Sequence, residues 1–128
     1  MNENKCRIVV SERSSGFCEA RLVGQHAYRC LGMAQTMHHR RKRSQGGEWR
    51  PSNILHVCGD GTRGCHGYIE ANPAMARKYG LWLFAGQHPV SSPAKVAFRG
   101  TSAWYLLDDE GNMTWLSRDA LARLKPGV

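Results

Sequence analysis

Apolar residues occur in short groups along this chain, and glycine, proline and polar residues separate the groups. The β-branched group Ile8–Val10 predicts a short strand near the start of the chain. Residues 36–43 and 53–57 predict two further extended segments, on either side of a polar loop that holds two glycines and a proline. Three glycines within residues 58–64 then predict a tight turn.

Helical signals follow that turn. Residues 66–71 are expected to begin a helix, and Asn72 before Pro73 is typical of the cap and first residue of a helix, with Gly80 closing it. The rest of the chain predicts strands at 81–85, 94–98, 103–107 and 112–116, a hairpin turn at 108–111, and a last helix at 118–124 capped by Ser117. We therefore expect a core in residues 1–80 and a C-terminal extension in residues 81–128, made of a hairpin plus a short helix.

Length and charge narrow the class of protein. The 128 residues suffice for one domain, or for one domain with an appendage. Eighteen basic and ten acidic residues give a net charge of +8, which predicts an anionic partner. Residues 1–66 carry 11 basic and 5 acidic residues (11 − 5 = +6), whereas residues 67–128 carry 7 and 5 (7 − 5 = +2). The positive charge is therefore concentrated in the first half.

The centre of that charge is a basic run, which is followed by one more arginine: Arg40, Arg41, Lys42, Arg43 and Arg50. Such a run is either a solvated surface or a phosphate-binding surface. Here it directly follows His38 and His39, and cations beside candidate metal ligands suit a phosphodiester substrate because they hold its phosphates by charge.

Membrane and secreted proteins are not expected from this sequence. The longest apolar run, Leu81 to Ala85, is far shorter than the ~20 residues that span a bilayer. The first residues carry no cleavable signal pattern, so we expect a cytoplasmic protein without membrane partners. In that compartment cysteines stay reduced, which favours metal ligands or plain thiols over disulfides.

Four cysteines flank the basic run: Cys18, Cys30, Cys58 and Cys65. Four thiolates bind zinc tetrahedrally, and such a site replaces the hydrophobic core that a small domain lacks. Eleven residues separate the first two cysteines and six the last two, with glycines nearby that allow the turns. The alternative is a set of buried free thiols. Cys6 lies outside this pattern and is expected to pack as a small apolar side chain.

A second group of residues carries candidate chemistry: His38, His39, Asn53, His66 and Glu70. Adjacent histidines on a strand point to opposite faces, so one can bind a metal while its neighbour meets water or substrate. His66 and Glu70 are four residues apart, which places both on one face of a helix as ligands to a divalent metal.

Together these residues resemble the HNH endonucleases, most closely the small stand-alone proteins of bacteriophages and prophages. The resemblance covers residues 12–80 and rests on Cys18, Cys30, His38-His39-Arg40, Gly46-Gly47, Pro51-Ser52-Asn53, Cys58-Gly59-Asp60-Gly61-Thr62 and Gly64-Cys65-His66 through Glu70. It implies an α+β fold: a ββα-metal, treble-clef-like core with a structural zinc site, followed by a small β-rich C-terminal extension.

The resemblance also implies a role for each residue. His38, His66 and Glu70 would bind one catalytic divalent metal (Mg²⁺, Mn²⁺ or a transition metal), His39 would activate water, and Asn53 would orient His39. Double-stranded DNA would be contacted by the basic residues Arg40, Arg41, Lys42, Arg43 and Arg50. The protein would act in a bacterial host cell, and phage terminase or packaging proteins would be further partners. Two positions depart from the family: Glu70 stands where many members have histidine, and Arg21 where many have a second cysteine.

Three functions follow as hypotheses. The first is a metal-dependent DNA endonuclease, in phage DNA processing or packaging. The second is a zinc-stabilised DNA-binding module without catalysis, which Glu70 would favour. The third is a treble-clef interaction protein of a phage packaging complex, whose basic face docks a partner. The combination of His38, His39, Asn53 and His66 favours the endonuclease, because a binding protein needs neither a base nor a residue that orients it.

Overall fold

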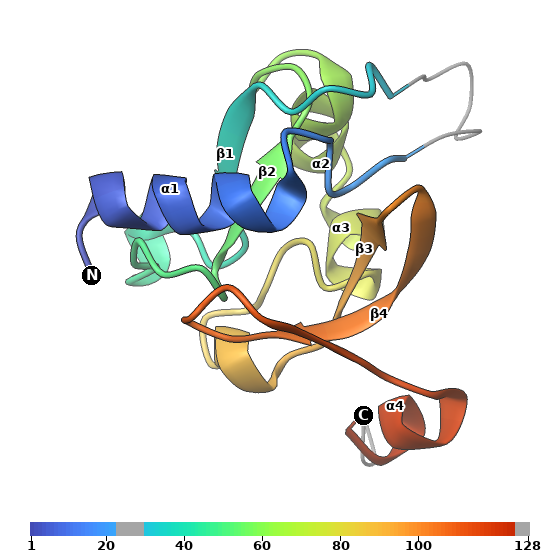
Figure 1. The fold of residues 1–128 in the computed structure, drawn as a ribbon. Coiled ribbons are helices and arrows are strands. Elements are labelled where there is room, and N and C mark those ends of the chain that lie inside the picture. Colours follow the sequence, from blue (N-terminus) through green and yellow to red (C-terminus); the bar gives the residue numbers. More distant parts are fainter. Residues whose placement is uncertain (23–29, 125–128) are drawn as a thin grey trace.

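Two antiparallel sheets and the helices packed around them build the structure, a computed structural model that describes residues 1–22 and 30–124 (Figure 1). In chain order the described elements are α1 (Glu3–Ser14), β1 (Thr36–His39), the 3₁₀ turn η1 (Arg43–Gln45), β2 (Ile54–Val57), α2 (Gly64–Ala71), α3 (Pro73–Lys78), the 3₁₀ turn η2 (Pro89–Ser91), β3 (Ala94–Phe98), β4 (Thr101–Leu107), β5 (Met113–Trp115) and α4 (Arg118–Leu124). No helix in these two ranges is long and apolar enough to cross a membrane.

The strand predicted at Ile8–Val10 is wrong, because these residues lie inside helix α1. The Asn2 side chain accepts a hydrogen bond from the backbone N–H of Lys5 and so caps the helix. Cys6 and Val10, four residues apart, are fully buried on one face of α1 against Ile54 of β2. Capping and four-residue spacing therefore outweigh the strand preference of the β-branched residues.

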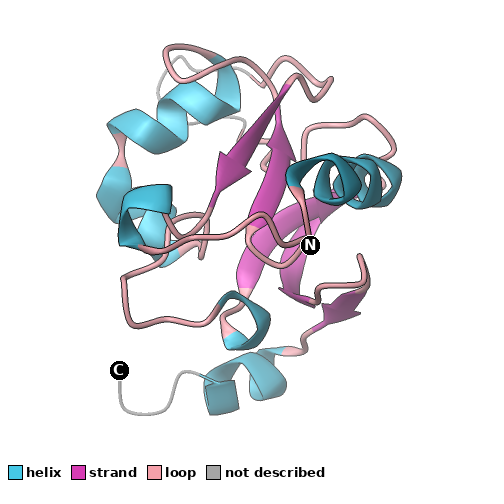
Figure 2. Ribbon diagram, turned by 90° about the vertical axis from the view of Figure 1, so that its left-hand side faces the viewer, coloured by secondary structure: helices cyan, strands magenta, loops and turns pink. Residues whose placement is uncertain are grey.

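The first sheet is the hairpin of β1 and β2, in which Thr36 pairs with Val57 and His38 pairs with Leu55. Figure 2 shows this hairpin between α1 on one side and α2 with α3 on the other. The turn from β2 into α2 requires glycine: a Cβ on Gly59 (φ 78°) would lie 2.0 Å from the Arg63 carbonyl oxygen. The predicted order of strand, loop, strand, turn and helix is confirmed over residues 36–71.

The second sheet has the order β3-β4-β5. Its strands confirm three of the predicted segments, and the hairpin turn predicted at 108–111 joins β4 to β5. Helix α4 is confirmed with its cap, because Ser117 Oγ accepts a hydrogen bond from Ala120 N at 3.1 Å. The strand predicted at 81–85 is wrong: the Leu81 amide donates to the Ala76 carbonyl and the Leu83 amide to the Arg40 carbonyl, so the segment follows the helix end as a loop.

One hydrophobic core spans the predicted boundary at residue 80. Leu55 and Ile69, from the first part, are fully buried in the same cluster as Leu81, Val96 and Leu107 from the second. The second sheet therefore contributes to the core that supports β2 and α2. The mixed helix and sheet composition agrees with the predicted α+β class.

Candidate metal centres

The structure brings the four predicted cysteines together into a sulfur cluster, defined here as Cys18, Cys30, Cys58 and Cys65. Their Sγ atoms all lie within 4.8 Å of one another, and three of the four residues are buried. Cys30 Sγ and Cys58 Sγ are 3.7 Å apart. A disulfide requires about 2.05 Å, whereas the edge of a tetrahedron with zinc–sulfur bonds of about 2.3 Å is about 3.8 Å. This cluster can hold a structural metal such as zinc.

Backbone amides surround the sulfur cluster and point their N–H groups at it. Cys58 Sγ accepts from Leu31 N at 3.3 Å and from Cys65 N at 3.1 Å. Four further amide donors reach the other sulfurs at 3.3–3.4 Å: those of Arg21, Leu22, Gly32 and Cys58. Amide donors stabilise thiolates, the form of cysteine that binds metal.

The thiol pKa values show why a cation suits this cluster. A hydrogen bond with Cys65 lowers the pKa of Cys18 to about 5, whereas burial raises the pKa of Cys30 to about 12. Without a cation Cys18 and Cys30 therefore differ in protonation at neutral pH. A divalent cation would allow all four to ionise and would offset their mutual repulsion.

A second cluster, the His/Glu cluster, consists of His38 on β1 with His66 and Glu70 on α2. Their ligand atoms also lie within 4.8 Å of one another. Glu70 Oε1 is 3.6 Å from His38 Nδ1 and 3.8 Å from His66 Nε2. Two ligands with bonds of about 2.1 Å in a tetrahedral site are about 3.4 Å apart, so a cation needs only a small contraction of this cluster.

Hydrogen bonds at the far side of each imidazole orient its metal-facing nitrogen. His38 Nε2 lies 2.6 Å from the Leu81 carbonyl oxygen, which can only accept, so Nε2 carries a proton and Nδ1 is the nitrogen left to face Glu70. Thr36 Oγ1 donates to the Gly59 carbonyl and therefore accepts from His66 Nδ1 at 2.7 Å. The lone pair of His66 then lies on Nε2. His38 Nδ1 and His66 Nε2 both face Glu70, and these are the two nitrogens that would bind a metal.

Protonation also favours cation binding at the His/Glu cluster. Contact with His38, and then with the Lys42 ammonium, lowers the pKa of Glu70 to about 2, so the carboxylate is ionised at neutral pH. Burial lowers the pKa of His66, which keeps its imidazole neutral there. Lys42 Nζ lies 2.5 Å from Glu70 Oε2 and 4.1 Å from the centre of the Trp82 ring. One oxygen of Glu70 is thus paired with Lys42, and the other faces the histidines.

His39, the predicted base, lies on the opposite side of the strand from His38 and packs edge-on against Trp49, with ring centres 4.6 Å apart. It lines a cavity of about 280 Å³ together with His66, Glu70, Lys42 and Arg43. Its Nε2 is buried and finds no hydrogen-bond partner among the described residues. Burial, with the neighbouring His38, lowers the pKa of His39 to about 4, so its imidazole is neutral at neutral pH.

Asn53 is predicted to orient His39, but no hydrogen bond that the structure describes joins Asn53 to the His39 imidazole. Its Oδ1 accepts from Arg41 N at 2.7 Å, and its Nδ2 donates to the carbonyls of Arg41 and Glu48 at 3.1 Å. Asn53 therefore ties down both ends of the loop between β1 and β2. It can position His39 only through that backbone.

The prediction that Arg40 binds DNA is wrong. Its side chain is fully buried, and its guanidinium donates to backbone carbonyls of Gly80, Ser52 and Ser92 at 2.6–2.8 Å, with longer contacts to those of Pro89 and Pro93. Burial lowers the pKa of Arg40 to about 9. Arg40 therefore joins the β1–β2 hairpin to the second half of the chain and is shielded from any ligand.

The other four residues predicted to bind DNA lie in two different places. Lys42 and Arg43 line the cavity of the His/Glu cluster. Arg41 and Arg50 line a different hollow, and Arg50 pairs with Glu48 at 2.5 Å and with Asp109 at 3.2 Å. Only the first group lies beside the candidate catalytic centre.

Sequence reasoning missed three contributors to the His/Glu cluster: Thr36, the Leu81 carbonyl and Trp82. Thr36 stands two residues before His38, so strand alternation places both on one face, and that signal would have found it. The Leu81 and Trp82 contacts join residues 43 and 40 positions apart in the chain, which no local pattern reveals. Comparisons of the chain with protein-family models, with curated proteins and with solved structures found no match.

Proposed function

We propose that this protein is a metal-dependent DNA endonuclease of the HNH type that hydrolyses phosphodiester bonds. The observation that carries the proposal is the His/Glu cluster, in which two imidazoles oriented by hydrogen bonds and one ionised carboxylate converge beside a neutral histidine. The order of β1, β2 and α2 that builds the cluster agrees with the ββα arrangement that the resemblance implies.

The donor set suits a divalent cation. Two imidazole nitrogens and one carboxylate oxygen leave room for water and substrate ligands, as a catalytic site needs. Because Glu70 supplies a carboxylate oxygen, this site favours harder ions such as Mg²⁺ or Mn²⁺ more than a site made of imidazoles alone would. Such a cation, when bound, would stabilise the charge that develops at the scissile phosphate and on the leaving 3′ oxygen.

The chain's own residues would carry the remaining chemistry. Neutral His39 would accept the proton of the attacking water, and Trp49 would hold its ring in place. Asn53 would keep the β1–β2 loop fixed, so that His39 stays at the cavity. Lys42 and Arg43 would contact the flanking phosphates by charge. The expected products carry a 5′-phosphate and a 3′-hydroxyl.

The sulfur cluster would have a separate task. A zinc ion there would join the N-terminal segment that carries Cys18 and Cys30 to the turn and helix that carry Cys58 and Cys65. Because His66 follows Cys65 directly, the structural ion would also fix the start of the helix that bears the catalytic ligands. Double-stranded DNA is the proposed partner, and a phage packaging role rests on the resemblance alone.

A second candidate is a zinc-stabilised DNA-binding module without catalysis. The ion pair between Lys42 and Glu70 favours it, because the ammonium already neutralises the carboxylate that would bind the catalytic metal. In that case Lys42 would take the place of the metal as the counter-ion of Glu70. The protein would then bind DNA and leave it intact.

Incubation with supercoiled plasmid separates the two candidates. We expect the wild-type protein to cut the plasmid with Mg²⁺ or Mn²⁺ and to be inactive when EDTA is present. His39→Ala should lower the rate by ~10²–10⁴, the range for loss of a general base, while DNA binding stays intact. His88→Ala is the matched control, because His88 is exposed and outside both clusters. A plasmid that is bound but left intact under every metal condition would support the binding module instead.

A further inference from the structure

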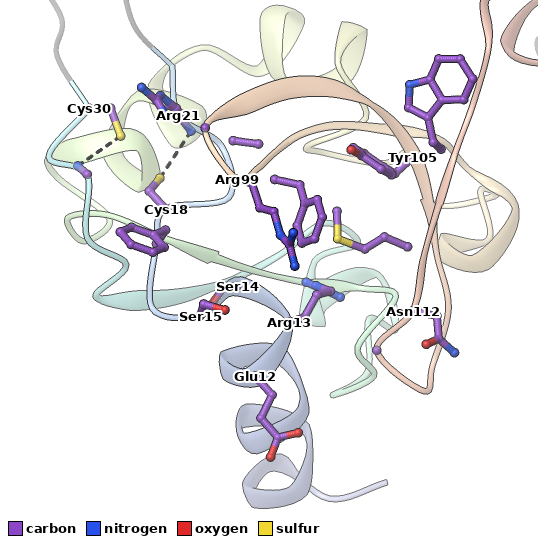
Figure 3. A pocket seen from close by; sticks show the side chains of 18 residues that line it. Glu12, Arg13, Ser14, Ser15, Cys18, Arg21, Cys30, Arg99, Tyr105 and Asn112 are labelled. Atoms are coloured by element: carbon purple, nitrogen blue, oxygen red, sulfur yellow. Dashed lines mark hydrogen bonds between the residues drawn. The ribbon is translucent and has the colours of Figure 1, made fainter.

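A large cavity lies on a part of the surface that shares no lining residue with the cavity of the His/Glu cluster. Its volume is about 1110 Å³. The end of α1 with Ser14 and Ser15 forms one wall, and the β3–β4 turn with Arg99 forms another (Figure 3). Asn112 and Tyr105 lie on the side of β4 and β5. Cys18 and Cys30 of the sulfur cluster also line the cavity, and its other lining residues have no part in the proposed endonuclease mechanism.

Exposed aromatic rings line this cavity. Phe17 is 60% exposed, Trp115 is 63% exposed and Phe98 is 40% exposed, and Tyr105 lies against Phe98 with ring centres 6.4 Å apart. Large exposed aromatic side chains gathered at one cavity indicate a binding surface, because a protein without a partner there would bury such side chains in its own core. Planar rings also offer flat faces on which other planar groups stack.

Two arginines add positive charge to the same cavity. Arg21 and Arg99 both have left-handed backbone conformations, with φ of 41° and 51°, which arginine seldom adopts. Arg99 forms the turn between β3 and β4 with Gly100, and a Cβ on Gly100 would lie 3.2 Å from the Arg21 guanidinium. The two loops that present the arginines therefore approach each other closely, and both are held in an unusual backbone conformation.

Neither arginine forms a salt bridge in the described part of the chain, including with Glu12, the exposed acidic residue that also lines this cavity. Arg13, at the same cavity, differs: its guanidinium forms two hydrogen bonds of 2.8 Å with Glu19. In Figure 3 the Arg99 side chain reaches across the cavity toward the end of α1, and it lies 5.2 Å from the centre of the Phe98 ring. The cavity thus combines two available cations with stacking surfaces.

We propose that this cavity binds a single-stranded segment of nucleic acid and is a second nucleic-acid site, separate from the His/Glu cluster. Bases would stack on Phe17, Phe98 and Trp115, and Arg21 and Arg99 would contact the phosphates. Aromatic platforms combined with a cationic groove are how proteins bind single strands without reading sequence. An acidic peptide would satisfy the two arginines, but its carboxylates would make no use of three exposed rings.

The test is binding of a fluorescent oligothymidylate of roughly a dozen nucleotides, a length in the range of single-strand sites. Anisotropy is measured without added Mg²⁺ or Mn²⁺, so that the strand stays intact. Trp115→Ala should weaken binding by roughly 5- to 150-fold, the effect of removing one stacking ring. Trp115→Phe should retain most of the affinity, because it keeps an aromatic face.

Arg99→Asn tests the charge, since asparagine tolerates a positive φ. It should reduce the slope of log affinity against log salt concentration by about 0.7, the value for one phosphate contact to a single strand. Arg118→Asn, an exposed arginine outside the cavity lining, is the matched control and should leave affinity and slope unchanged.

Two results would overturn the proposal. One is an affinity for oligothymidylate that neither Trp115→Ala nor Arg99→Asn changes. The other is displacement of the strand by an oligoglutamate peptide at equal concentration, which would assign the cavity to an acidic protein segment. Plasmid cutting is measured in parallel and should stay at the wild-type rate in these variants. A chain that never cuts DNA would contradict the endonuclease and leave the binding result intact.

Discussion

The sulfur cluster and the His/Glu cluster differ in the number and kind of their ligands and in how far the chain encloses them. The sulfur cluster is made of four identical soft ligands, largely buried, with six described backbone amides pointing at the sulfurs. The His/Glu cluster has three ligands of two kinds, borders a cavity, and shares Glu70 with Lys42. A closed four-ligand site suits a structural ion, and an open three-ligand site suits a catalytic one.

The two clusters are joined by very short pieces of chain. Cys65 and His66 are neighbours on α2, and Thr36 Oγ1 contacts both the Gly59 carbonyl and His66. The turn of residues 58–64 therefore supplies a sulfur ligand at Cys58 and, through Gly59 and Thr36, supports His66. A change in the sulfur cluster is expected to reach the His/Glu cluster, whereas the reverse effect should be small because the sulfur cluster keeps all its own ligands.

Cys58→Ser should have the largest effect, because it replaces the thiolate that would bind zinc and that accepts two amide hydrogen bonds with a neutral hydroxyl on a shorter bond. We expect a loss of more than about 5 kcal/mol in the free energy of unfolding, since structural zinc supplies much of the stability of small metal domains. Thermal denaturation followed by circular dichroism measures it. Cys6→Ala is the control, a buried cysteine outside the cluster, with an expected loss of about 1 kcal/mol. Equal losses in the two variants would return the four cysteines to buried thiols.

Thr36→Val should have an intermediate effect that is confined to the His/Glu cluster. Valine keeps the shape and strand preference of threonine but cannot accept the hydrogen bond from His66 Nδ1. We expect Mn²⁺ affinity, measured by calorimetry, to fall by about 10- to 100-fold, the usual effect of losing a group that orients a metal ligand. Thr114→Val, at an exposed position of β5, should leave the affinity unchanged. An unaltered affinity in Thr36→Val would contradict the role of Thr36 in orienting His66 toward a metal.

Lys42→Met should have the smallest effect, and its two consequences should have opposite signs. Methionine keeps contact with Trp82 but frees Glu70 from its ion pair. Mn²⁺ should then bind about fivefold more tightly, which corresponds to ~1 kcal/mol for a partly exposed pair. Binding of duplex DNA at low salt should weaken, because one phosphate contact is lost. Tighter binding of both ligands, or weaker binding of both, would contradict this role of Lys42.

Local sequence signals predicted the parts of the molecule that local interactions build. The glycines around residue 59, the four-residue spacing of His66 and Glu70, and the cap at Ser117 each correspond to an observed turn, helix face or helix start. Three consecutive β-branched residues predict a strand where the chain forms helix α1. The buried face of that helix packs against Ile54, a contact between distant segments that the local sequence does not show.

The roles of several site residues depend on contacts between distant segments, and those could not be predicted. Arg40 looks like its basic neighbours in the sequence, but carbonyls from three other segments enclose its guanidinium. Asn53 was expected to contact His39 and instead holds the backbone of the loop. In both cases the residue type was informative about hydrogen bonding, and the partner was decided by the tertiary fold.

The most direct test measures zinc content and plasmid cutting in one sample of purified protein that has been dialysed against EDTA. If the two centres have these separate roles, about one Zn²⁺ per chain should remain after dialysis, and cutting should be abolished and then restored by added Mg²⁺ or Mn²⁺. A folded protein that retains no zinc would contradict the structural role of the sulfur cluster. Cutting that persists in EDTA would contradict the catalytic role of the His/Glu cluster.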